Sequence, residues 1–252
     1  INLFKTMKSG ELVENEADES VSLGKLNEED YKGWHWHSWL ERRPTQLLVG
    51  SLIVILIGSI IEIIPTMMSE KSVNQIASVE PYTSLELEGR DIYIREGCVG
   101  CHSQLIRSLR SESERYGPIS QSSEYVYDRP FLWGSKRTGP DLHREGQKYP
   151  NSWHYIHMRD PQALSPGSIM PSYPWLYEQN LDFQDIEKKM EVLKSLGVPY
   201  NNIEITNAKA DLMKQADEIK SNLAKEKIEV DSNKEIIALI AYLQKLGVTI
   251  KQ

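Results

Sequence analysis

The sequence predicts a mainly α-helical protein in which one transmembrane helix near the N-terminus is followed by an all-α domain with long loops. Three observations predict this architecture. Residues 46–64 form an apolar run whose only charged residue is Glu62. Apolar residues recur at helical spacing near the C-terminus. The segment between about residues 98 and 174 is rich in Gly, Pro and Ser without sustained periodicity, which is typical of loops and short helices.

The apolar run has the length of a membrane span, since a bilayer core of about 30 Å needs about 20 largely apolar residues in a helix. A buried core helix is the alternative, but such helices are rarely apolar on every face. The run begins only at Gln46, and no small-residue cleavage site follows it, so a retained anchor is favoured over a signal peptide. We expect a membrane anchor over residues 37–68, with its helix at about 46–64 and in contact with lipid.

The charges that flank the span predict its orientation. Lys32, Arg42 and Arg43 precede it, and only Lys71 follows closely. By the positive-inside rule the N-terminus is cytoplasmic and the C-terminal body lies outside, in the periplasm or its equivalent.

The segment before the span is acidic and short of aromatic residues, as in a solvated linker. Because the chain begins with Ile1, we interpret residues 1–36 as an acidic cytoplasmic linker or the tail of a fusion behind another subunit. The Trp-rich residues 34–39 include His35 and His37; anchoring at the lipid headgroups is the favoured interpretation and a metal-binding role the alternative. The chain has 36 acidic against 29 basic residues and no basic stripe, so nucleic acid is not expected as a partner.

Helices are predicted on both sides of the loop-rich segment. Thr83 or Ser84 can cap a helix that runs from about Leu85 towards Cys98, with glutamates in its first turn. The C-terminal part is expected to form helices at about residues 183–196, 208–229 and 234–246, with Gly197 and Gly247 as C-caps. The stretch at about 201–233 has few large apolar residues, so we expect a helical excursion exposed to solvent.

Both cysteines of the chain lie in one Cys-x-x-Cys-His unit, formed by Cys98, Cys101 and His102. This spacing is typical of covalent haem c attachment, in which the histidine is the proximal iron ligand. A redox Cys-x-x-Cys is an alternative, but it needs a thioredoxin-like βαβ setting that the sequence lacks. A zinc site needs four ligands, and only His154 and His157 could complete one, at a spacing unlike common zinc fingers.

Met170 is the favoured sixth ligand of the haem iron. It stands in a proline-stiffened loop, Ser-Ile-Met-Pro-Ser-Tyr-Pro, and a thioether ligand raises the reduction potential, as suits an electron carrier. An ordinary core methionine is the alternative. The proximal imidazole also needs an acceptor for its second nitrogen, and the turn Arg137–Leu142 offers the carbonyl of Pro140; an ordinary turn is the alternative there. With both axial positions filled, the domain is expected to pass electrons and to contain no catalytic residue.

The motifs together resemble class I cytochrome c. They are Cys-x-x-Cys-His after a short helix, Thr-Gly-Pro-x-Leu, Met-Pro-x-Tyr and a closing helix with Ala-Tyr-Leu. In that fold the first and last helices cross at a small residue and an aromatic residue. The resemblance implies that Gly89, Tyr93 and Tyr242 take these positions.

Longer strings resemble the mono-haem subunit of cbb-type haem-copper cytochrome c oxidases, from about His37 to the C-terminus. The strings are Leu87–Gly97, Cys98–Gln104, Phe131–Leu142 and Met170–Leu176. The resemblance implies an electron relay in a bacterial inner membrane, with residues 69–252 as a periplasmic domain that carries one haem c. Such a subunit takes electrons from a di-haem cytochrome c subunit and passes them to the b-type haem of the catalytic subunit, which reduces oxygen to water with proton pumping.

The resemblance also implies a calcium ion shared with the catalytic subunit, with Ser135 as one ligand. From the residues alone, Ser135, Lys136 and Arg137 form a polar, basic loop that either pairs with haem carboxylates or is solvated. Two other functions stay open, the cytochrome c subunit of a nitric oxide reductase and a free-standing membrane-tethered electron shuttle. The Leu-Glu-Gly-Arg-Asp and Gly-Ser-Lys-Arg strings favour the oxidase.

Overall fold

The computed structural model describes residues 40, 43–68, 79–128 and 130–248. The residues that it describes form helices, loops and one isolated antiparallel bridge between Asn180 and Lys234. The mainly α fold class is thereby confirmed. By its contacts the chain divides into two units, residues 1–71 and 72–252. The predictions for residues 1–36 and for His35 and His37 lie outside the described residues.

The first unit contains α3, Pro44–Met68, which includes the predicted span. Its segment Pro44–Pro65 is long and apolar enough to cross a bilayer, and none of its most apolar stretch is buried within the protein. Large side chains such as Leu48 and Val54 are more than two-thirds exposed. A helix with apolar residues on all faces and no protein core around it fits a lipid environment.

The second unit begins with α4, Ser84–Arg95. Its N-cap is Thr83, one of the two residues that the sequence predicts, and the structure adds a capping box. The Thr83 hydroxyl accepts a hydrogen bond from the Glu86 amide at 3.3 Å, and the Glu86 carboxylate accepts one from the Thr83 amide at 2.8 Å. The helix ends at Glu96, and Gly97 follows with a φ of 71°. The left-handed turn at Gly97 redirects the chain just before Cys98.

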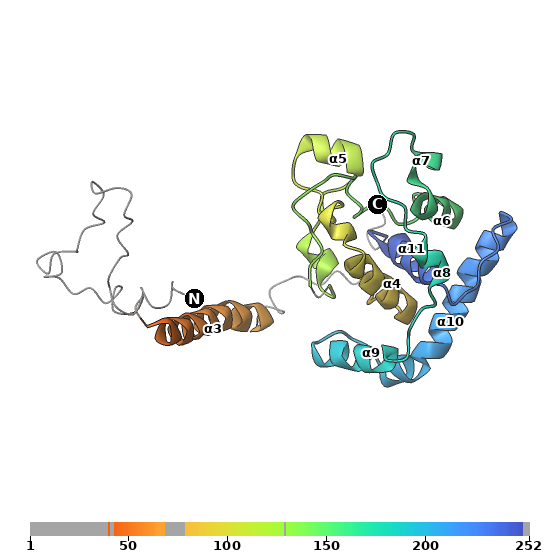
Figure 1. Ribbon diagram of the computed structural model, residues 1–252. Helices are drawn as coiled ribbons and strands as arrows, with labels where there is room; N and C mark the ends of the chain where they lie inside the picture. Colours follow the sequence, from red (N-terminus) through yellow and green to blue (C-terminus); the bar gives the residue numbers. More distant parts are fainter. Residues whose placement is uncertain (1–39, 41–42, 69–78, 129, 249–252) are drawn as a thin grey trace, which may run out of the picture. The chain divides into compact units, whose positions relative to one another are not determined.

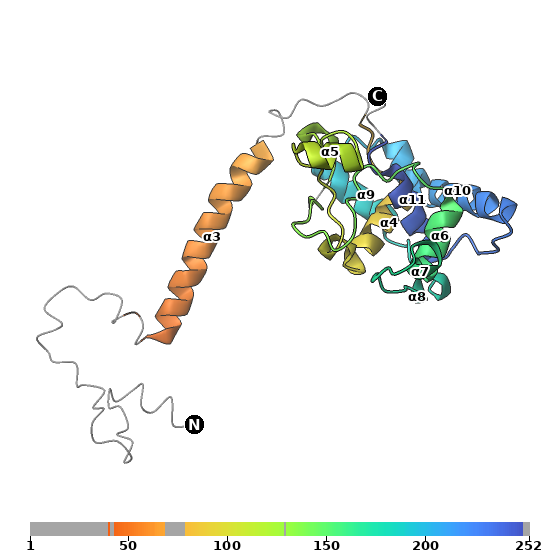
Figure 2. The same cartoon turned by 90° about the horizontal axis from the view of Figure 1, so that it is seen from above.

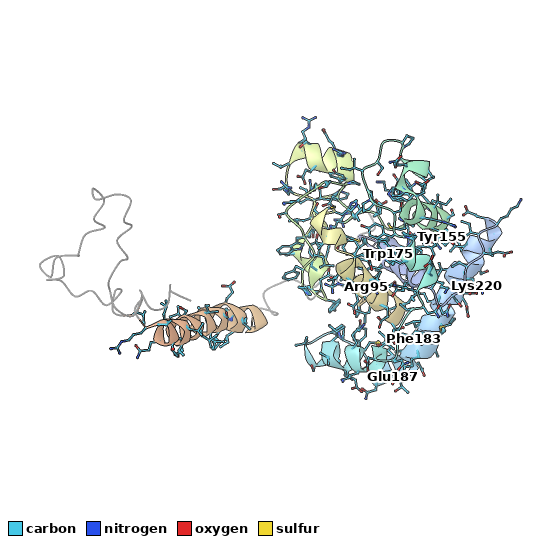
Figure 3. All side chains as sticks on the ribbon, in the orientation of Figure 1. Arg95, Tyr155, Trp175, Phe183, Glu187 and Lys220 are labelled. Atoms are coloured by element: carbon cyan, nitrogen blue, oxygen red, sulfur yellow. The ribbon has the colours of Figure 1, made fainter. Side chains whose placement is uncertain are left out.

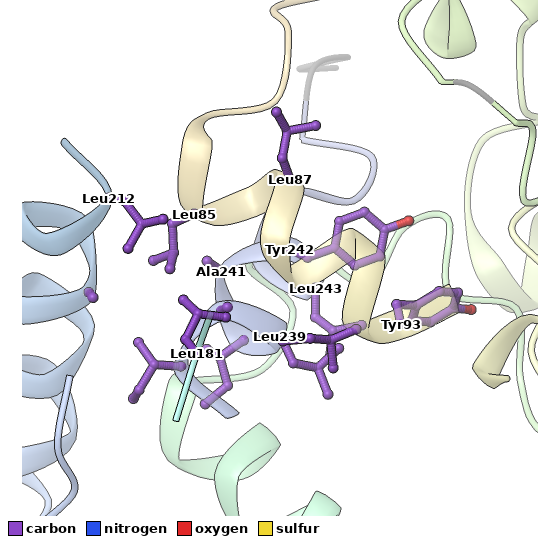
Figure 4. Close-up of a cluster of buried hydrophobic side chains, with 14 of the residues drawn as sticks. Leu85, Leu87, Tyr93, Leu181, Leu212, Leu239, Ala241, Tyr242 and Leu243 are labelled. Atoms are coloured by element: carbon purple, nitrogen blue, oxygen red, sulfur yellow. The ribbon is translucent and has the colours of Figure 1, made fainter. Parts of the chain in front are cut away.

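Helix α11, Glu235–Lys245, crosses α4 at the centre of this unit (Figure 1). A Cβ atom at Gly89 would lie 1.9 Å from the carbonyl oxygen of Ala238, so the two backbones are in direct contact. The rings of Tyr93 and Tyr242 pack beside this crossing with their centroids 5.3 Å apart (Figure 4). Gly89, Tyr93 and Tyr242 thus occupy the crossing that the cytochrome c resemblance implies.

Two further helices flank this pair, α9 at Ile186–Ser195 and α10 at Asn202–Lys225 (Figure 2). Helix α10 contacts α4, α9, α11 and α6 through one buried face. The buried residues of that face are Ile205, Ala208, Leu212, Ala216 and Leu223. The expectation that this stretch is exposed is wrong for that face, because Ile205, Leu212 and Leu223 pack on the core together with two small alanines. Gly197 and Gly247 have positive φ directly after α9 and α11, as predicted for helix ends.

The segment between α4 and α8 is irregular, as predicted. Its short helices are η3 Cys98–Gly100, α5 Arg110–Tyr116, η4 Ser122–Tyr125, α6 Asn151–Arg159, α7 Pro161–Leu164 and α8 Trp175–Glu178. Buried polar groups hold this segment to the helices. Arg90 of α4, for example, pairs with the buried Asp128 at 3.0 Å and donates to the carbonyl of Pro130.

The helix crossing generates a stability prediction. Gly89→Ala adds a methyl group where the backbone of α11 already lies, and overpacking of this kind costs about 1–3 kcal/mol. We expect the midpoint of thermal unfolding of the purified protein, followed by circular dichroism, to fall by several degrees. Gly100→Ala is the matched control, since nothing lies within 4 Å of a Cβ built there. Equal midpoints for the two variants would contradict the direct backbone contact.

Candidate functional site

The Cys-x-x-Cys-His unit folds as a single tight turn at the end of α4. The amide of His102 donates to the carbonyl of Cys98 at 2.8 Å, and the amide of Cys101 donates to the same oxygen at 3.1 Å. Cys98 is half-buried against the core, Cys101 is exposed, and neither forms a disulfide. The turn therefore presents two free thiols and an imidazole from one short stretch of chain.

The segment that begins at Gly139 holds the imidazole ring of His102. Its Nδ1 lies 2.9 Å from the carbonyl oxygen of Pro140, the acceptor expected from the sequence. A Cβ atom at Gly139 would lie 2.2 Å from Cε1 of the ring, so only glycine leaves room for this approach. When Nδ1–H donates to Pro140, Nε2 carries the free lone pair and is the nitrogen available to a metal.

Met170 lies half-buried against the core in the loop between α7 and α8. The amide of Tyr173 donates to the carbonyl of Met158 at 2.9 Å, which joins this loop to α6. The indole of Trp175 donates to the Glu96 carboxylate at 2.9 Å, near Arg95 at the end of α4 (Figure 3). The loop that carries Met170 is thus tied to the residues just before Cys98. Iron ligation by Met170 stays a prediction.

Arg137 and Ser135 lie on the loop that precedes Pro140. The guanidinium of Arg137 is largely buried and pairs with Glu112 at 2.7 Å and with Asp141 at 3.3 Å. These bonds already engage much of the Arg137 side chain. A contact between Arg137 and the cofactor stays a prediction. Ser135 is exposed.

Burial lowers the pKa of all four histidines that the structure describes. They are His102, His143, His154 and His157. For His102 the hydrogen bond to Pro140 and the charge of Asp141 act in the opposite direction but are smaller. A lowered pKa keeps the imidazole neutral near pH 7, which is the form that can ligate a metal.

Helix α6 adds two buried nitrogen atoms to the surroundings of His102. Nε2 of His154 and Nδ1 of His157 are buried and have no hydrogen-bond partner among the described residues. The pKa of His157 is lowered by burial and also by His102, so the two imidazoles act on each other. Leaving a buried polar atom unpaired costs about 1–3 kcal/mol. A group with polar edge atoms, such as haem, fits these surroundings.

The Cys98 thiol does not have the character of a redox-active or metal-bound thiolate. Burial raises the pKa of Cys98 to about 12, with a further contribution from Glu96. Redox-active cysteines instead have a lowered pKa, because the thiolate is the reactive form. Among the described residues, no group of three or more His, Cys, Asp or Glu side chains is placed to hold a metal ion, so the zinc interpretation finds no support there.

Comparison with known proteins decides the family. The family described as “Cytochrome C oxidase, mono-heme subunit/FixO” matches residues 37–250. The chain belongs to this family. The chain is also 25% identical over 119 residues to the cytochrome c oxidase subunit 2 of Alkalihalophilus pseudofirmus. That match covers 47% of the chain and 28% of the relative, so the subunit spans less than a third of that protein's length.

The family confirms the resemblance on which the sequence analysis rests: the chain is a cytochrome subunit related to terminal oxidases, with one apolar helix that fits a membrane anchor.

Sequence reasoning considered His154 and His157 only as zinc ligands. A signal for aromatic stacking was present in the sequence, since Tyr149, Trp153 and His157 are spaced four residues apart. In the structure these rings stack, with a centroid distance of 4.2 Å between Tyr149 and Trp153 and of 4.4 Å between Trp153 and His157.

The contact between Gly139 and the His102 ring generates a prediction for the loaded protein. In Gly139→Ala the new methyl group displaces the ring and weakens its bond to Pro140. We expect a smaller fraction of low-spin haem in the visible absorption spectrum than in the wild type. Gly100→Ala, which adds the same methyl group in open space, serves as the control. An unchanged spectrum in Gly139→Ala would show that the ring is not held at this position.

The buried His143 generates a pH prediction. Burial lowers its pKa to about 4, with a contribution from Arg144, whereas the unfolded value is about 6.5. Between these values the unfolded chain binds a proton that the folded chain does not. The contribution of His143 to the free energy of unfolding is therefore complete above about pH 6.5 and is lost as the pH falls towards 4, by up to about 3 kcal/mol.

Urea unfolding at pH 7 and pH 4.5 measures this loss of stability. We expect His143→Gln to lose less stability between the two pH values than the wild type, because glutamine does not titrate. Some loss remains, since burial also lowers the pKa of His154 to about 4. Identical losses in variant and wild type would contradict the assignment.

Proposed function

We propose that this chain is the electron-relay subunit of a respiratory terminal oxidase and carries one covalent haem c. The observation that carries the proposal is the Cys98–His102 turn, whose imidazole is oriented by the carbonyl of Pro140. Membership in the mono-haem oxidase subunit family supports it. When bound, haem supplies a reversible one-electron iron couple.

Each residue of the site has one task in this proposal. Cys98 and Cys101 would hold the porphyrin covalently through thioether bonds. Nε2 of His102 would bind the iron, while the carbonyl of Pro140 holds Nδ1. Met170 would supply a second ligand to the iron, which would leave no position for a small molecule. In this proposal no residue that the structure describes is a catalytic residue.

We base the proposed partners on the family assignment and on exposed residues of the domain. We propose that electrons enter from a di-haem cytochrome c subunit and leave to the b-type haem of the catalytic subunit, which reduces oxygen with proton pumping. Cys101 is exposed among the residues of the site. The rings of Phe131 and Trp133 stack with their centroids 4.6 Å apart and are also exposed. They offer an apolar contact for a neighbouring subunit.

The anchor and the calcium ion belong to the same proposal. Helix α3 crosses a bacterial inner membrane with its N-terminal end in the cytoplasm, and residues 69–252 form the periplasmic domain. A calcium ion at Ser135 would take its other ligands from the catalytic subunit, since Ser135 is exposed and the described residues contain no acidic or imidazole cluster for a metal.

Two other functions make different predictions for the purified complex. A nitric oxide reductase subunit would copurify with an enzyme that consumes nitric oxide rather than oxygen. A free-standing shuttle would purify without any polytopic partner. Oxygen consumption by a complex that contains this chain favours the oxidase over both.

The role of Met170 provides the test. In Met170→Leu the iron loses its sixth ligand while the volume of the side chain is nearly kept. We expect carbon monoxide to bind the c-type haem of the reduced variant, and electron flow to oxygen to fall at least tenfold in the purified complex. Met190→Leu is the matched control, because Met190 is a buried core methionine, 3% exposed. A Met170→Leu complex that does not bind carbon monoxide at haem c would refute Met170 as ligand.

A further inference from the structure

Resting on the proposed haem site, we propose that Asp141 and Arg137 form a buried charge pair that positions the Pro140 carbonyl against His102 and sets the reduction potential of the haem. Both lie on the segment that carries Pro140. They are positioning residues, because they act through the contact between Pro140 and His102 and through their charge. Nothing in the family description assigns them a role.

The carboxylate of Asp141 is enclosed by hydrogen-bond donors. Its side chain is 0% exposed. Oδ2 accepts from the hydroxyl of Ser103 at 2.6 Å and from the amide of Leu105 at 2.8 Å, and Oδ1 accepts from the amide of His143 at 2.9 Å. These donors compensate a buried negative charge that would otherwise be costly.

Arg137 supplies the opposite charge on the same cluster. Its Nη2 lies 3.3 Å from Oδ2 of Asp141 and 2.7 Å from Oε2 of Glu112. Its Nε donates to the hydroxyl of Ser103 at 2.5 Å, and Nη2 also donates to the carbonyl of Leu105 at 2.6 Å. The Arg137 cation thus faces two carboxylates, of which Glu112 also pairs with Arg107 at 3.3 Å.

The position of the cluster in the chain couples it to the iron ligand. Ser103 follows His102, and Asp141 follows Pro140, so the bond between Ser103 and Asp141 lies directly beside the contact between His102 and Pro140. The amide of Leu142 also donates to the carbonyl of Ser103 at 2.9 Å. These adjacent bonds keep the two segments in register, so the carbonyl of Pro140 cannot shift without breaking them.

The charges act on the redox equilibrium with opposite signs. Reduction adds one negative charge to the haem, so the anion at Asp141 favours the oxidised form and the cation at Arg137 favours the reduced form. At short range, with an effective dielectric constant of about 20, one unit charge changes the ratio of reduced to oxidised haem roughly tenfold. For a one-electron couple this change equals about 59 mV.

The test is a spectroelectrochemical titration of haem c in the purified membrane complex. Asp141→Asn keeps the shape of the side chain and removes the charge, so we expect the potential to rise by about 59 mV. Arg137→Gln removes the cation that pairs with Asp141, while Arg107 still pairs with Glu112 at 3.3 Å, so we expect a fall of similar size. Arg137→Lys keeps the charge and should restore most of the wild-type potential.

A purely structural role gives a different pattern. A loosened site would shift the potential in the same direction in Asp141→Asn and Arg137→Gln, and Arg137→Lys would not restore it; either result would overturn the proposal. Asp128→Asn is the matched control, since Asp128 is equally buried and paired with Arg90 but lies outside this cluster. A shift of equal size in that control would also refute the proposal.

The wild-type protein separates this inference from the proposed function. If it carries no covalent haem, the proposed function fails before any variant is compared. If it carries haem c and the potentials of the variants do not move apart, only the charge pair is refuted. Should Asp141→Asn fail to incorporate haem, the fall of the potential in Arg137→Gln and its restoration in Arg137→Lys still decide the question.

Discussion

The backbone contact between α4 and α11 at Gly89 is the constraint on which the rest of the domain depends. A side chain at this position would overlap the carbonyl of Ala238, so the two helices approach as closely as their backbones permit. The contact brings Tyr93 and Tyr242 together and fixes the direction of α4. Because α4 ends only two residues before Cys98, its direction decides where the cysteines and His102 are presented.

The loop-rich segment around His102 is organised by polar contacts more than by apolar packing. The carbonyl of Pro140 holds the imidazole, and the cluster around Asp141 holds the segment that carries Pro140. Side chains in such a network have fixed partners, so the site is arranged before an electron arrives. A cofactor with a large apolar face supplies what the long loops lack, since an irregular segment of this length cannot bury a core of its own. In the proposed function, covalent attachment of haem would act together with this network to keep His102 in one geometry.

The sequence predicted the features that depend on local chemistry. The N-cap at Thr83, the apolar face of α11 and the apolar length of α3 each need only neighbouring residues, and each is present in the structure. The buried face of α10 was missed because its few large apolar residues, Ile205, Leu212 and Leu223, are widely spaced among polar residues. The cluster of Asp141 with Arg137 was missed for another reason: its bonds join segments that are more than 30 residues apart, and residue types alone do not reveal such pairing.

The central claim is that one haem is bound covalently at Cys98 and Cys101. The most direct measurement is a pyridine haemochrome spectrum of the purified chain after denaturation and acid–acetone extraction, compared with the double variant Cys98→Ala, Cys101→Ala. A c-type spectrum that stays with the wild-type polypeptide and is absent from the variant is the result expected. A wild-type polypeptide that retains no haem after extraction would contradict the claim and leave the site without its proposed cofactor.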